Sequence, residues 1–560
     1  MEQALKVFKY WLQNAGGEVL TDLVGIADDD AEIRQRFDKE IRFGTAGLRG
    51  KMGAGINRLN IYTVGRAAAG LGKTLENKKA VIAYDNRFNS RLFAETAAEV
   101  LAAQDVKVYL FKEPAPTPML SFAVRELNCG AGIMITASHN GREYNGFKCY
   151  GADGCQMTER AADSVIKAMS DFDYFNLPKA AVNAEAVSQR LIEKYYTAVE
   201  NQLLNPGLLA ETDLEVLYTP LNGTGGKAVM QVLQNCGLRS LQILPVQAEP
   251  DGNFATCPKP NPELAEAYEE ALKYAKKTQP ELILATDPDA DRLGIIVCAG
   301  GEFKLLSGNE IGCLLLDYIL QSKQRKGTLP ENPVVIKTVV TAPMAEILAA
   351  EYGCEVINLP VGFKYICEQL KELEKSDRMS DFILGFEESN GYLCGSYTGD
   401  KDGVLAAALV CEMTAYYKKH SQTLIDRLEY LYQRYGCHVN EIQDILFDGL
   451  VGTEAMQCFL QDVHANPFRN LGKRRTCSIA DYLRGEKLNL ADGTAEKIFL
   501  PKNDMLEFRF SDGCSLVIRP SGTESKLKIY YNSEGKTFDK ATKIVAEMKD
   551  DMQDIIKNYL

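Results

Sequence analysis

Three aspartates that alternate with other residues carry the clearest chemical signal in this sequence. Asp287, Asp289 and Asp291 lie in the stretch Asp-Pro-Asp-Ala-Asp-Arg, directly after the apolar run 282–285. Alternate residues of an extended segment point the same way, and three converging carboxylates repel one another unless a cation lies between them. Such oxygen ligands suit Mg²⁺, which keeps positions open for a phosphate oxygen. Arg292 follows at once and can bind phosphate with two parallel hydrogen bonds. We therefore predict a metal and phosphate site.

Two other interpretations of this stretch need to be considered. Alternating aspartates also begin the calcium loop of an EF-hand, but that loop needs Gly at its sixth position and Glu at its twelfth. Arg292 and Cys298 stand there, which excludes it. A solvated acidic turn is disfavoured by the apolar runs 282–285 and 293–297, because they predict a strand on each side of a short loop.

A serine loop follows another apolar run. Residues 136–140 read Thr-Ala-Ser-His-Asn after the run 132–135, which places the Ser138 hydroxyl in a polar turn at a strand end. A helix cap is an equally good interpretation of the local pattern. A nucleophile elbow is excluded, because the glycines of G-x-S-x-G are absent. We read residues 145–148 as a turn that returns Lys148 toward Ser138, where it could donate to phosphate or transfer a proton. A surface lysine is the alternative.

Three further loops carry polar groups that suit a phosphorylated sugar. The glycine-dense stretch 43–50 contains Arg49, and its glycines allow the backbone to approach an anion closely. In the stretch 385–391, Glu387 and Ser389 offer acceptors for neighbouring sugar hydroxyls. Further along the chain, Asp402 could cap the apolar helix that is expected after it. The stretch 519–524, from Arg519 on, combines a guanidinium, two hydroxyls and backbone N–H groups into a phosphate cradle, with a plain hairpin turn as the alternative.

Apolar runs and helix-like segments alternate over most of the chain. This alternation predicts α/β units with mostly parallel sheets, whose ligands collect at the carboxyl ends of the strands. The expected strands include 81–83, 106–111, 132–135, 214–218, 282–285, 334–340 and 382–384, and the expected helices include 91–104, 226–233, 262–277 and 343–351. Short alternating strands at 505–510, 515–518 and 527–531 and a helix over 538–560 predict a smaller α+β domain at the end.

We therefore expect three similar α/β domains with mixed to mostly parallel sheets and a smaller α+β domain, arranged around a central cleft. The expected domains are 1–206 with the serine loop (136–140), 207–327 with the metal loop (287–292), 328–445 with the sugar loop (385–391) and 446–560 with the phosphate loop (519–524).

Composition limits the class of protein. The 560 residues have a net charge of −13, which disfavours nucleic acid and acidic membranes as partners. No apolar run approaches the roughly 18 residues of a membrane span, and the first residues lack a signal-peptide core. Fifteen cysteines without a CxxC pair indicate reduced thiols rather than disulfides or zinc ligands, so we expect a cytoplasmic protein.

In their order along the chain these loops resemble the α-D-phosphohexomutase superfamily, from Phe43 to Lys528. The motifs that carry the resemblance are FGTAGLRG, TASHN, DPDADR, GFEESNG and RPSGT. The chain looks most similar to a subgroup with an extended N-terminus that includes glucose, mannose and pentose phosphomutases and a glucose-1,6-bisphosphate synthase. The resemblance implies a mutase that interconverts hexose 1-phosphate and hexose 6-phosphate, most often of glucose, through a phosphoserine and a sugar bisphosphate.

The resemblance also implies roles for residues at matching positions. Ser138 would carry the phosphoryl group, and one Mg²⁺ would be bound by Ser138, Asp287, Asp289 and Asp291. Lys148 would be the favoured group for proton transfer and His139 the second, and a sugar 1,6-bisphosphate would act as activator. The residues implied at the reacting end are Lys148, His139, Arg49 and Arg292. The residues implied for substrate binding are Thr45, Gly362, Glu387, Ser389, Lys401, Arg519, Ser521, Gly522, Thr523 and Lys528. Asp85 and Arg87 match a structural loop.

Some positions depart from the family pattern. Gly141 stands where the serine loop usually continues with Pro, and Lys528 stands where many members have Arg. Val361 precedes Gly362 where glucose-type members often have Thr, which leaves the sugar preference open. A metal-dependent sugar phosphatase and a non-catalytic sensor are the alternatives from other classes. The partner is expected to be a small phosphosugar, and the chain a monomer or homodimer.

Overall fold

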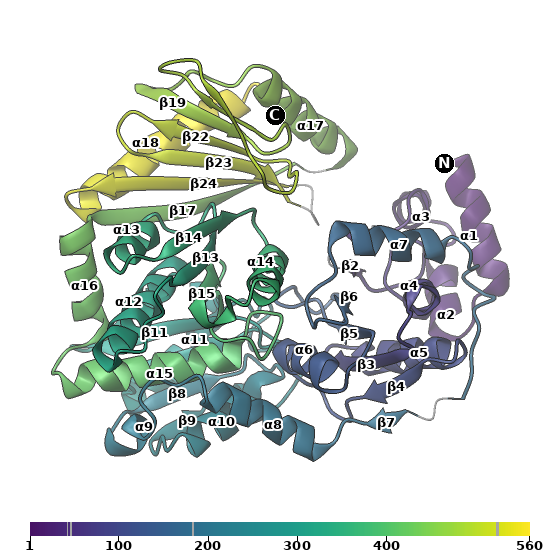
Figure 1. Cartoon of the computed structure of the whole chain (residues 1–560). Helices are drawn as coiled ribbons and strands as arrows, with labels where there is room; N and C mark the ends of the chain where they lie inside the picture. The colour runs from purple at the N-terminus through teal and green to yellow at the C-terminus, as the bar shows by residue number, and fades with distance from the viewer. Residues whose placement is uncertain (42, 45–46, 182–183, 448, 522–525, 560) are drawn as a thin grey trace.

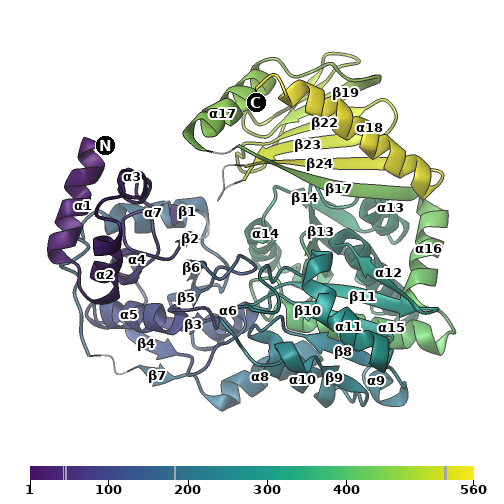
Figure 2. The same cartoon turned by 180° about the vertical axis from the view of Figure 1, so that it is seen from behind.

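The computed structural model describes residues 1–41, 43–44, 47–181, 184–447, 449–521 and 526–559. Four sheets follow one another along the chain and define four domains, which we number in chain order. Figures 1 and 2 show domain 1 on one side, domains 2 and 3 together on the other, and domain 4 above domain 3. Three α/β domains with mixed sheets and a β-rich last domain confirm the predicted fold class.

Domain 1 is built on a mixed seven-stranded sheet in the order β1-β2-β6-β5-β3-β4-β7. Its central strand β5 is buried at all five residues, as expected when helices cover both faces of a sheet. The strands are β1 (Phe43–Gly44), β2 (Gly47–Lys51), β3 (Lys79–Tyr84), β4 (Lys107–Leu110), β5 (Ala131–Ile135), β6 (Tyr144–Gly151) and β7 (Glu185–Ala186). The helices are α1 (Glu2–Asn14), α2 (Gly17–Gly25), α3 (Asp30–Phe37), α4 (Ile61–Thr74), α5 (Ser90–Ala102), α6 (Thr117–Glu126), α7 (Glu159–Met169) and α8 (Gln189–Glu200).

Domain 2 has a five-stranded sheet in the order β12-β11-β10-β8-β9. Strand β10 pairs in parallel with β8 and antiparallel with β11, so that the acidic loop joins two neighbouring strands. The strands are β8 (Val216–Thr219), β9 (Leu241–Ile243), β10 (Leu282–Thr286), β11 (Leu293–Ala299) and β12 (Glu302–Leu306). The helices are α9 (Leu208–Glu211), α10 (Gly225–Asn235) and α11 (Glu269–Thr278), with short 3₁₀ turns at Pro245–Gln247 and Ala265–Tyr268.

Domain 3 has a four-stranded sheet in the order β14-β13-β15-β16, in which only β16 runs antiparallel to its neighbour. The strands are β13 (Val334–Thr338), β14 (Glu355–Leu359), β15 (Phe382–Glu387) and β16 (Gly391–Leu393). The helices are α12 (Gly308–Lys326), α13 (Met344–Glu351), α14 (Phe363–Lys375), α15 (Gly403–Lys419) and α16 (Leu424–Tyr435), with a 3₁₀ turn at Met379–Asp381.

Domain 4 is an antiparallel sheet in the order β17-β24-β23-β22-β19-β20-β21, with β18 paired to β19, and α18 packs along β17 and β24. The strands are β17 (Cys437–Leu446), β18 (Asn470–Leu471), β19 (Arg474–Asp481), β20 (Glu486–Asn489), β21 (Ala495–Lys497), β22 (Leu506–Phe510), β23 (Ser515–Pro520) and β24 (Lys526–Gly535). The helices are α17 (Gly449–Ala465) and α18 (Phe538–Ile556).

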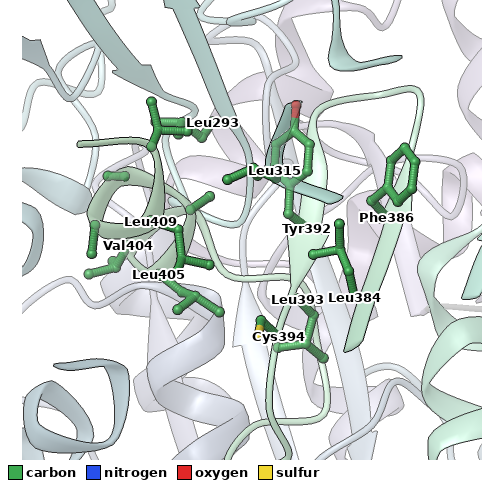
Figure 3. Packing of buried hydrophobic residues seen from close by; sticks show 14 of the residues in the cluster. Leu293, Leu315, Leu384, Phe386, Tyr392, Leu393, Cys394, Val404, Leu405 and Leu409 are labelled. Carbon is green, nitrogen blue, oxygen red and sulfur yellow. The ribbon is translucent and has the colours of Figure 1, made fainter. Parts of the chain in front are cut away.

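The hydrophobic core is shared unequally among the domains. One cluster of buried side chains runs through domains 1, 2 and 3, from Val81 to Tyr432. Helix α15 contributes to it from between domains 2 and 3, in contact with β11 and β16, and Figure 3 shows its Val404, Leu405 and Leu409 in the same cluster as Leu293 of β11 and Leu393 of β16. Domain 4 has a core of its own, and a small cluster around Val340 and Tyr530 joins it to domain 3.

Two sequence-based predictions of local structure were wrong. Residues 145–148 are not a turn but part of β6, where Asn145 pairs with Gly50 and Lys148 with Met134. The helix expected over 262–277 begins only at Glu269, after a loop and a 3₁₀ turn, because two prolines break the pattern before it. The capping interpretation of Asp402 was right, since its carboxylate accepts hydrogen bonds from the first turn of α15.

Among the described residues, no helix has the length and apolar character needed to cross a membrane. All fifteen cysteines are free thiols in the structure.

Candidate active site

Ser138 lies at the carboxyl end of β5 in a backbone conformation that side-chain-bearing residues rarely adopt. Its φ is 54°, and its N–H donates to Thr136 Oγ1 at 2.8 Å. The buried Arg87 guanidinium fixes the loop by donating hydrogen bonds to four carbonyl oxygens in and just after it, those of Ser138, Asn140, Gly141 and Tyr144. Such a strained conformation persists only where neighbouring groups fix it. The loop therefore presents the Ser138 hydroxyl in one defined place.

Asp85 in turn fixes Arg87. Its carboxylate accepts from Arg87 Nε at 3.0 Å, from Ser90 Oγ at 2.6 Å and from Thr136 Oγ1 at 2.7 Å. Burial raises the pKa of Asp85, and the charge of Arg87 opposes this shift. The structure thus places Asp85 and Arg87 under the serine loop, in agreement with the structural role that the resemblance implied.

The three aspartates of the acidic loop converge as predicted. Each carboxylate of Asp287, Asp289 and Asp291 offers an oxygen within 4.8 Å of the others, and all three residues are buried. The Ser138 hydroxyl donates to Asp287 Oδ2 at 2.7 Å, which brings the serine loop of domain 1 to the acidic loop of domain 2. Asp289 Oδ1 and Asp291 Oδ1 are buried and have no hydrogen-bond partner among the described residues. Buried carboxylate oxygens without partners fit a divalent cation.

Two lysines border the aspartates from neighbouring domains. Lys148 Nζ lies 2.6 Å from Asp289 Oδ2 and 3.4 Å from Asp291 Oδ2, and Lys401 Nζ lies 2.9 Å from Asp291 Oδ2. The Thr117 hydroxyl, which the sequence did not single out, donates to Asp289 Oδ2 at 2.8 Å. The site thus lies where domains 1, 2 and 3 meet.

Burial and charge set the protonation of these groups. Burial raises the pKa of Asp287, and the charges of Asp289 and Asp291 raise it further. For Asp289, burial also raises the pKa. The charges of Lys148 and Lys401 and hydrogen bonds with Asp287 and Lys148 together outweigh burial, so the pKa of Asp289 lies below the usual range. For Lys148, burial lowers the pKa, and the carboxylates of Asp289 and Asp291 more than compensate, so that its pKa is raised.

His139, Arg49 and Arg292 complete the surroundings of Ser138. His139 Nδ1 lies 3.2 Å from Ser138 Oγ, and Arg49 on β2 donates to Asn140 Oδ1 at 3.3 Å. Burial lowers the pKa of His139 well below its usual value, and the charges of Arg292 and Arg49 lower it further, so that the ring is neutral at neutral pH. The structure therefore brings the four residues expected at the reacting end together around Ser138.

The expected sugar-binding residues lie next to this centre. Glu387 ends β15 and is buried, which raises its pKa, while Lys401, Arg292 and a hydrogen bond with Ser389 oppose the shift. Gly391 leaves room for the side chains of Lys401 and Glu387. A Cβ at position 391 would lie 2.5 Å from the Lys401 side chain and 3.0 Å from Glu387 Oε1. Lys401 Nζ lies 5.7 Å from the centre of the Phe363 ring. Phe363 directly follows Gly362, so this contact places Gly362 next to the same group of residues.

Arg519 of domain 4 lies near the sugar loop of domain 3. Burial, and then the charge of Glu387, raise the pKa of Glu388 to about 7. The positive charge of Arg519 on β23 opposes this rise, so the two side chains lie close together. Arg519 Nε is buried without a hydrogen-bond partner among the described residues. Its strand neighbour Lys528 lies 3.5 Å from Asp444, and Ser521 N–H donates to the Lys526 carbonyl at 2.8 Å. Thr45, Gly522 and Thr523 lie outside the described residues.

Like Thr117, Glu263 is a residue of this site that the sequence did not single out. Glu263, from the loop before α11, forms a close ion pair with Arg292. The sequence pattern predicts a helix over 262–277 and gives no indication of a role for this carboxylate. The two prolines at 260 and 262 were the signal that could have marked a loop.

Comparison with known proteins agrees with this geometry. Four family models match the chain in order: phosphoglucomutase/phosphomannomutase alpha/beta/alpha domain I at residues 40–174, domain II at 193–300, domain III at 307–435, and the C-terminal domain at 483–551. A phosphoglucomutase of Staphylococcus aureus (strain bovine RF122 / ET3-1) is 34% identical over 542 residues, which cover 94% of this chain and 96% of the relative.

Solved structures share the fold. A protein of Thermus thermophilus, provisionally named a phosphomannomutase, superposes with a TM-score of 0.69 at 22% identity and covers 93% of this chain and 99% of its own. The open form of parafusin, a phosphoglucomutase of Paramecium, gives 0.67 at 19% identity, covering 93% and 96%. With these matches along nearly its whole length, the chain belongs to the phosphoglucomutase/phosphomannomutase family of phosphohexose mutases.

Proposed function

We propose that this enzyme interconverts hexose 1-phosphate and hexose 6-phosphate, with glucose as the main sugar, through a phosphoserine at Ser138 and a sugar bisphosphate. The observation that carries the proposal is the 2.7 Å hydrogen bond from the Ser138 hydroxyl to Asp287, which places a fixed hydroxyl beside three buried carboxylates. The S. aureus relative, which is named phosphoglucomutase, supports glucose. Mannose and pentose phosphomutase activity and glucose-1,6-bisphosphate synthesis are the alternatives within the family.

Mg²⁺ is the metal that we propose for the site. Asp287, Asp289, Asp291 and an oxygen at Ser138 would hold it, and it would neutralise negative charge on the transferring phosphoryl group. The ligand set contains only hard oxygen donors, which favours Mg²⁺ over softer metals. A sugar 1,6-bisphosphate would serve as activator, because it can phosphorylate Ser138.

The residues around Ser138 then have distinct tasks. Arg292 and Arg49 stabilise the charge that spreads over the phosphoryl oxygens, which is the main requirement of this chemistry. Lys148 stays our first candidate for proton transfer, since any positive charge bound by Asp289 and Asp291 removes the cause of its raised pKa. His139 is the second, as a neutral ring 3.2 Å from the serine oxygen.

The other end of the substrate belongs to domains 3 and 4. Glu387, Ser389, Gly362 and Lys401 would hold sugar hydroxyls, and the Arg519 loop, with Ser521, Gly522, Thr523 and Lys528, would bind the phosphate that does not react. The bisphosphate must turn round so that its second phosphate faces Ser138. Domain 4 must therefore move relative to the other domains.

A substrate panel tests the proposal. Glucose 1-phosphate, mannose 1-phosphate and ribose 1-phosphate should be assayed with Mg²⁺, with and without the matching bisphosphate. We expect the highest kcat/KM for glucose 1-phosphate and a shortened lag with bisphosphate. Release of inorganic phosphate in place of the isomer would identify a phosphatase instead.

Substitution of the nucleophile is the sharpest variant in this test. Ser138→Ala should abolish turnover while leaving the melting temperature within a few degrees, because only one hydroxyl and its hydrogen bond to Asp287 are lost. Ser170→Ala, at an exposed position after α7, is the control. Turnover of Ser138→Ala at the wild-type rate would refute the assignment.

Several broader expectations accompany the proposal. We propose that the enzyme works in the cytoplasm as a monomer or homodimer. The domain limits at 206, 327 and 445 and the central cleft also stay predictions.

A further inference from the structure

Arg292 lies directly beside the acidic triad but does not pair closely with it. Its Nε is 4.0 Å from Asp291 Oδ1 and makes no hydrogen bond among the described residues. Its Nη1 instead donates to Glu263 Oε1 in a close ion pair, and the side chain is 15% exposed. The guanidinium is thus held by a carboxylate that is not part of the triad.

This arrangement solves a competition for the carboxylate oxygens. A guanidinium next to carboxylates forms bidentate pairs with them and would occupy the oxygens that a divalent cation needs. Asp289 Oδ1 and Asp291 Oδ1 nevertheless accept no hydrogen bond among the described residues, and Arg292 Nε stays 4.0 Å from Asp291 Oδ1, although Arg292 directly follows Asp291 in the sequence. The guanidinium is paired with Glu263 instead, which is a contact able to keep it away from those oxygens.

The position of Glu263 is itself fixed. Its N–H donates to Asn261 Oδ1 at 3.1 Å, and the hydroxyl of Tyr268 donates to the carbonyl of Pro262 at 3.0 Å. The loop packs closely on β11 at Gly294, where a Cβ would lie only 2.4 Å from the Pro262 oxygen. Because Gly294 follows Arg292 by two residues, the carboxylate and its guanidinium are positioned by the same strand.

We propose that Glu263 is a positioning residue: it holds Arg292 off the acidic triad, so that the aspartates stay free for a divalent cation and the guanidinium faces the phosphoryl group on Ser138. The part that concerns the phosphoryl group rests on the proposed function, whereas the part that concerns the metal rests on the contacts of the triad alone. Glu263 acts through Arg292 and does not need to touch the substrate.

Metal binding without substrate tests the proposal. Mn²⁺ binding, followed by the paramagnetic resonance signal of the free ion, should be compared in the wild type, Glu263→Ala, Arg292→Ala and the double variant. Loss of Glu263 lets Arg292 pair with the triad, so Glu263→Ala should bind Mn²⁺ about 10- to 100-fold more weakly. Removal of Arg292 removes the competitor, so the double variant should return to within about threefold of Arg292→Ala.

The result that overturns the proposal is equally definite. Wild-type Mn²⁺ affinity in Glu263→Ala, or a double variant as weak as Glu263→Ala, would show that Glu263 does not act through Arg292. Glu266→Ala is the matched control, because this carboxylate is three residues further on, half-exposed, and paired with Lys259 rather than with an arginine of the site. It should bind Mn²⁺ as the wild type does.

Conservative and kinetic readouts separate positioning from folding. Glu263→Gln keeps an acceptor of the same shape and should bind Mn²⁺ with an affinity between those of the wild type and Glu263→Ala; it carries the test if the alanine variant does not fold. In turnover, kcat should fall more than KM rises, because Arg292 acts on the reacting phosphoryl group. Equal loss of Mn²⁺ affinity in Glu263→Gln and Glu266→Ala would count against the proposal.

Failure of the proposed function would look different. A wild-type protein that shows this pattern of Mn²⁺ binding but has no mutase turnover would refute the proposed function and support the role of Glu263 at the metal site. Normal turnover of the wild type together with unchanged Mn²⁺ binding in Glu263→Ala would refute the role of Glu263 and support the function.

Discussion

The two ends of the candidate active site are built in different ways. At the reacting end, buried contacts join three domains: Lys148 to Asp289, Lys401 to Asp291, and the Tyr150 hydroxyl to Asp400 at 2.7 Å. At the phosphate end, the side chain of Lys528 is 30% exposed and its Nζ lies 3.5 Å from Asp444 Oδ1, on the same sheet. One large core cluster runs through domains 1 to 3, beside smaller clusters within domains 1 and 2, whereas the main core of domain 4 is its own.

This difference matches the demands of the chemistry. Phosphoryl transfer needs fixed charges around one serine, and shared packing among three domains supplies that rigidity. A bisphosphate that turns round needs a second phosphate site that can release it and bind it again. A domain with a separate core and a small contact around Val340 and Tyr530 can move as a unit without disturbing the rest.

The reacting end should show the largest loss on substitution. Asp289→Asn removes one ligand charge and the main partner of Lys148, so we expect turnover with Mg²⁺ to fall by about a thousandfold or more. Steady-state kinetics over a range of Mg²⁺ concentrations measures this. Asp171 is exposed and paired with Lys73, and Asp171→Asn should leave kcat and KM unchanged. Near-normal activity of Asp289→Asn would remove the triad from the mechanism.

The phosphate end should respond mainly in KM. Arg519→Ala should raise KM for glucose 1-phosphate about 10- to 100-fold, because the bidentate phosphate contact that we propose for this guanidinium would be lost. Lys528→Ala should raise it only severalfold, since this side chain is partly exposed and already near Asp444. Equal effects in the two variants would contradict the larger role that we give to Arg519.

Separate cores predict separate unfolding. Leu409→Ala in α15 and Leu516→Ala in β23 remove matched, buried side chains from the two cores, and each should cost about 2–5 kcal/mol. Calorimetry should show two transitions, of which each variant lowers only one. A single transition that both variants shift equally would mean that domain 4 unfolds together with the other three.

The smallest expected effect is a pH dependence confined to domain 4. Hydrogen bonds from His464 to Asp504 and Asp481, at 2.9 Å each, raise the pKa of His464 above 6.5, although burial opposes the shift. The charged ring thus stabilises the domain fully below about pH 6.5, and this contribution is lost as the pH rises through the raised pKa. Urea unfolding between pH 6 and 9 should show this slope in the wild type and a flatter profile in His464→Gln.

Much of this site could be predicted from short stretches of sequence. The spacing of Asp287, Asp289 and Asp291 predicted converging carboxylates because a strand end fixes the direction of alternate side chains over a few residues. The strands at β5, β10 and β13 were recognisable as continuous apolar runs, since helices cover both faces of such strands. These are local effects, and local sequence is enough to reveal them.

Other features depended on contacts between distant segments. Lys148 reaches the triad from a strand and not from the predicted turn, because the pairing of β6 with β2 and β5 overrides a local Asn-Gly signal. Glu263 meets Arg292 only because its loop packs on β11 at Gly294. Neither contact can be predicted from the spacing of nearby residues.

The amino-acid sequence by itself determined the chemical groups of this protein and the order in which its loops present them. The tertiary structure alone decided which groups from separate domains meet, and which arginine is held by which carboxylate. The physical reason is range: backbone geometry carries direction across a few residues, whereas a contact across 29 or 149 positions, as in Arg292–Glu263 and Ser138–Asp287, exists only after the domains have packed.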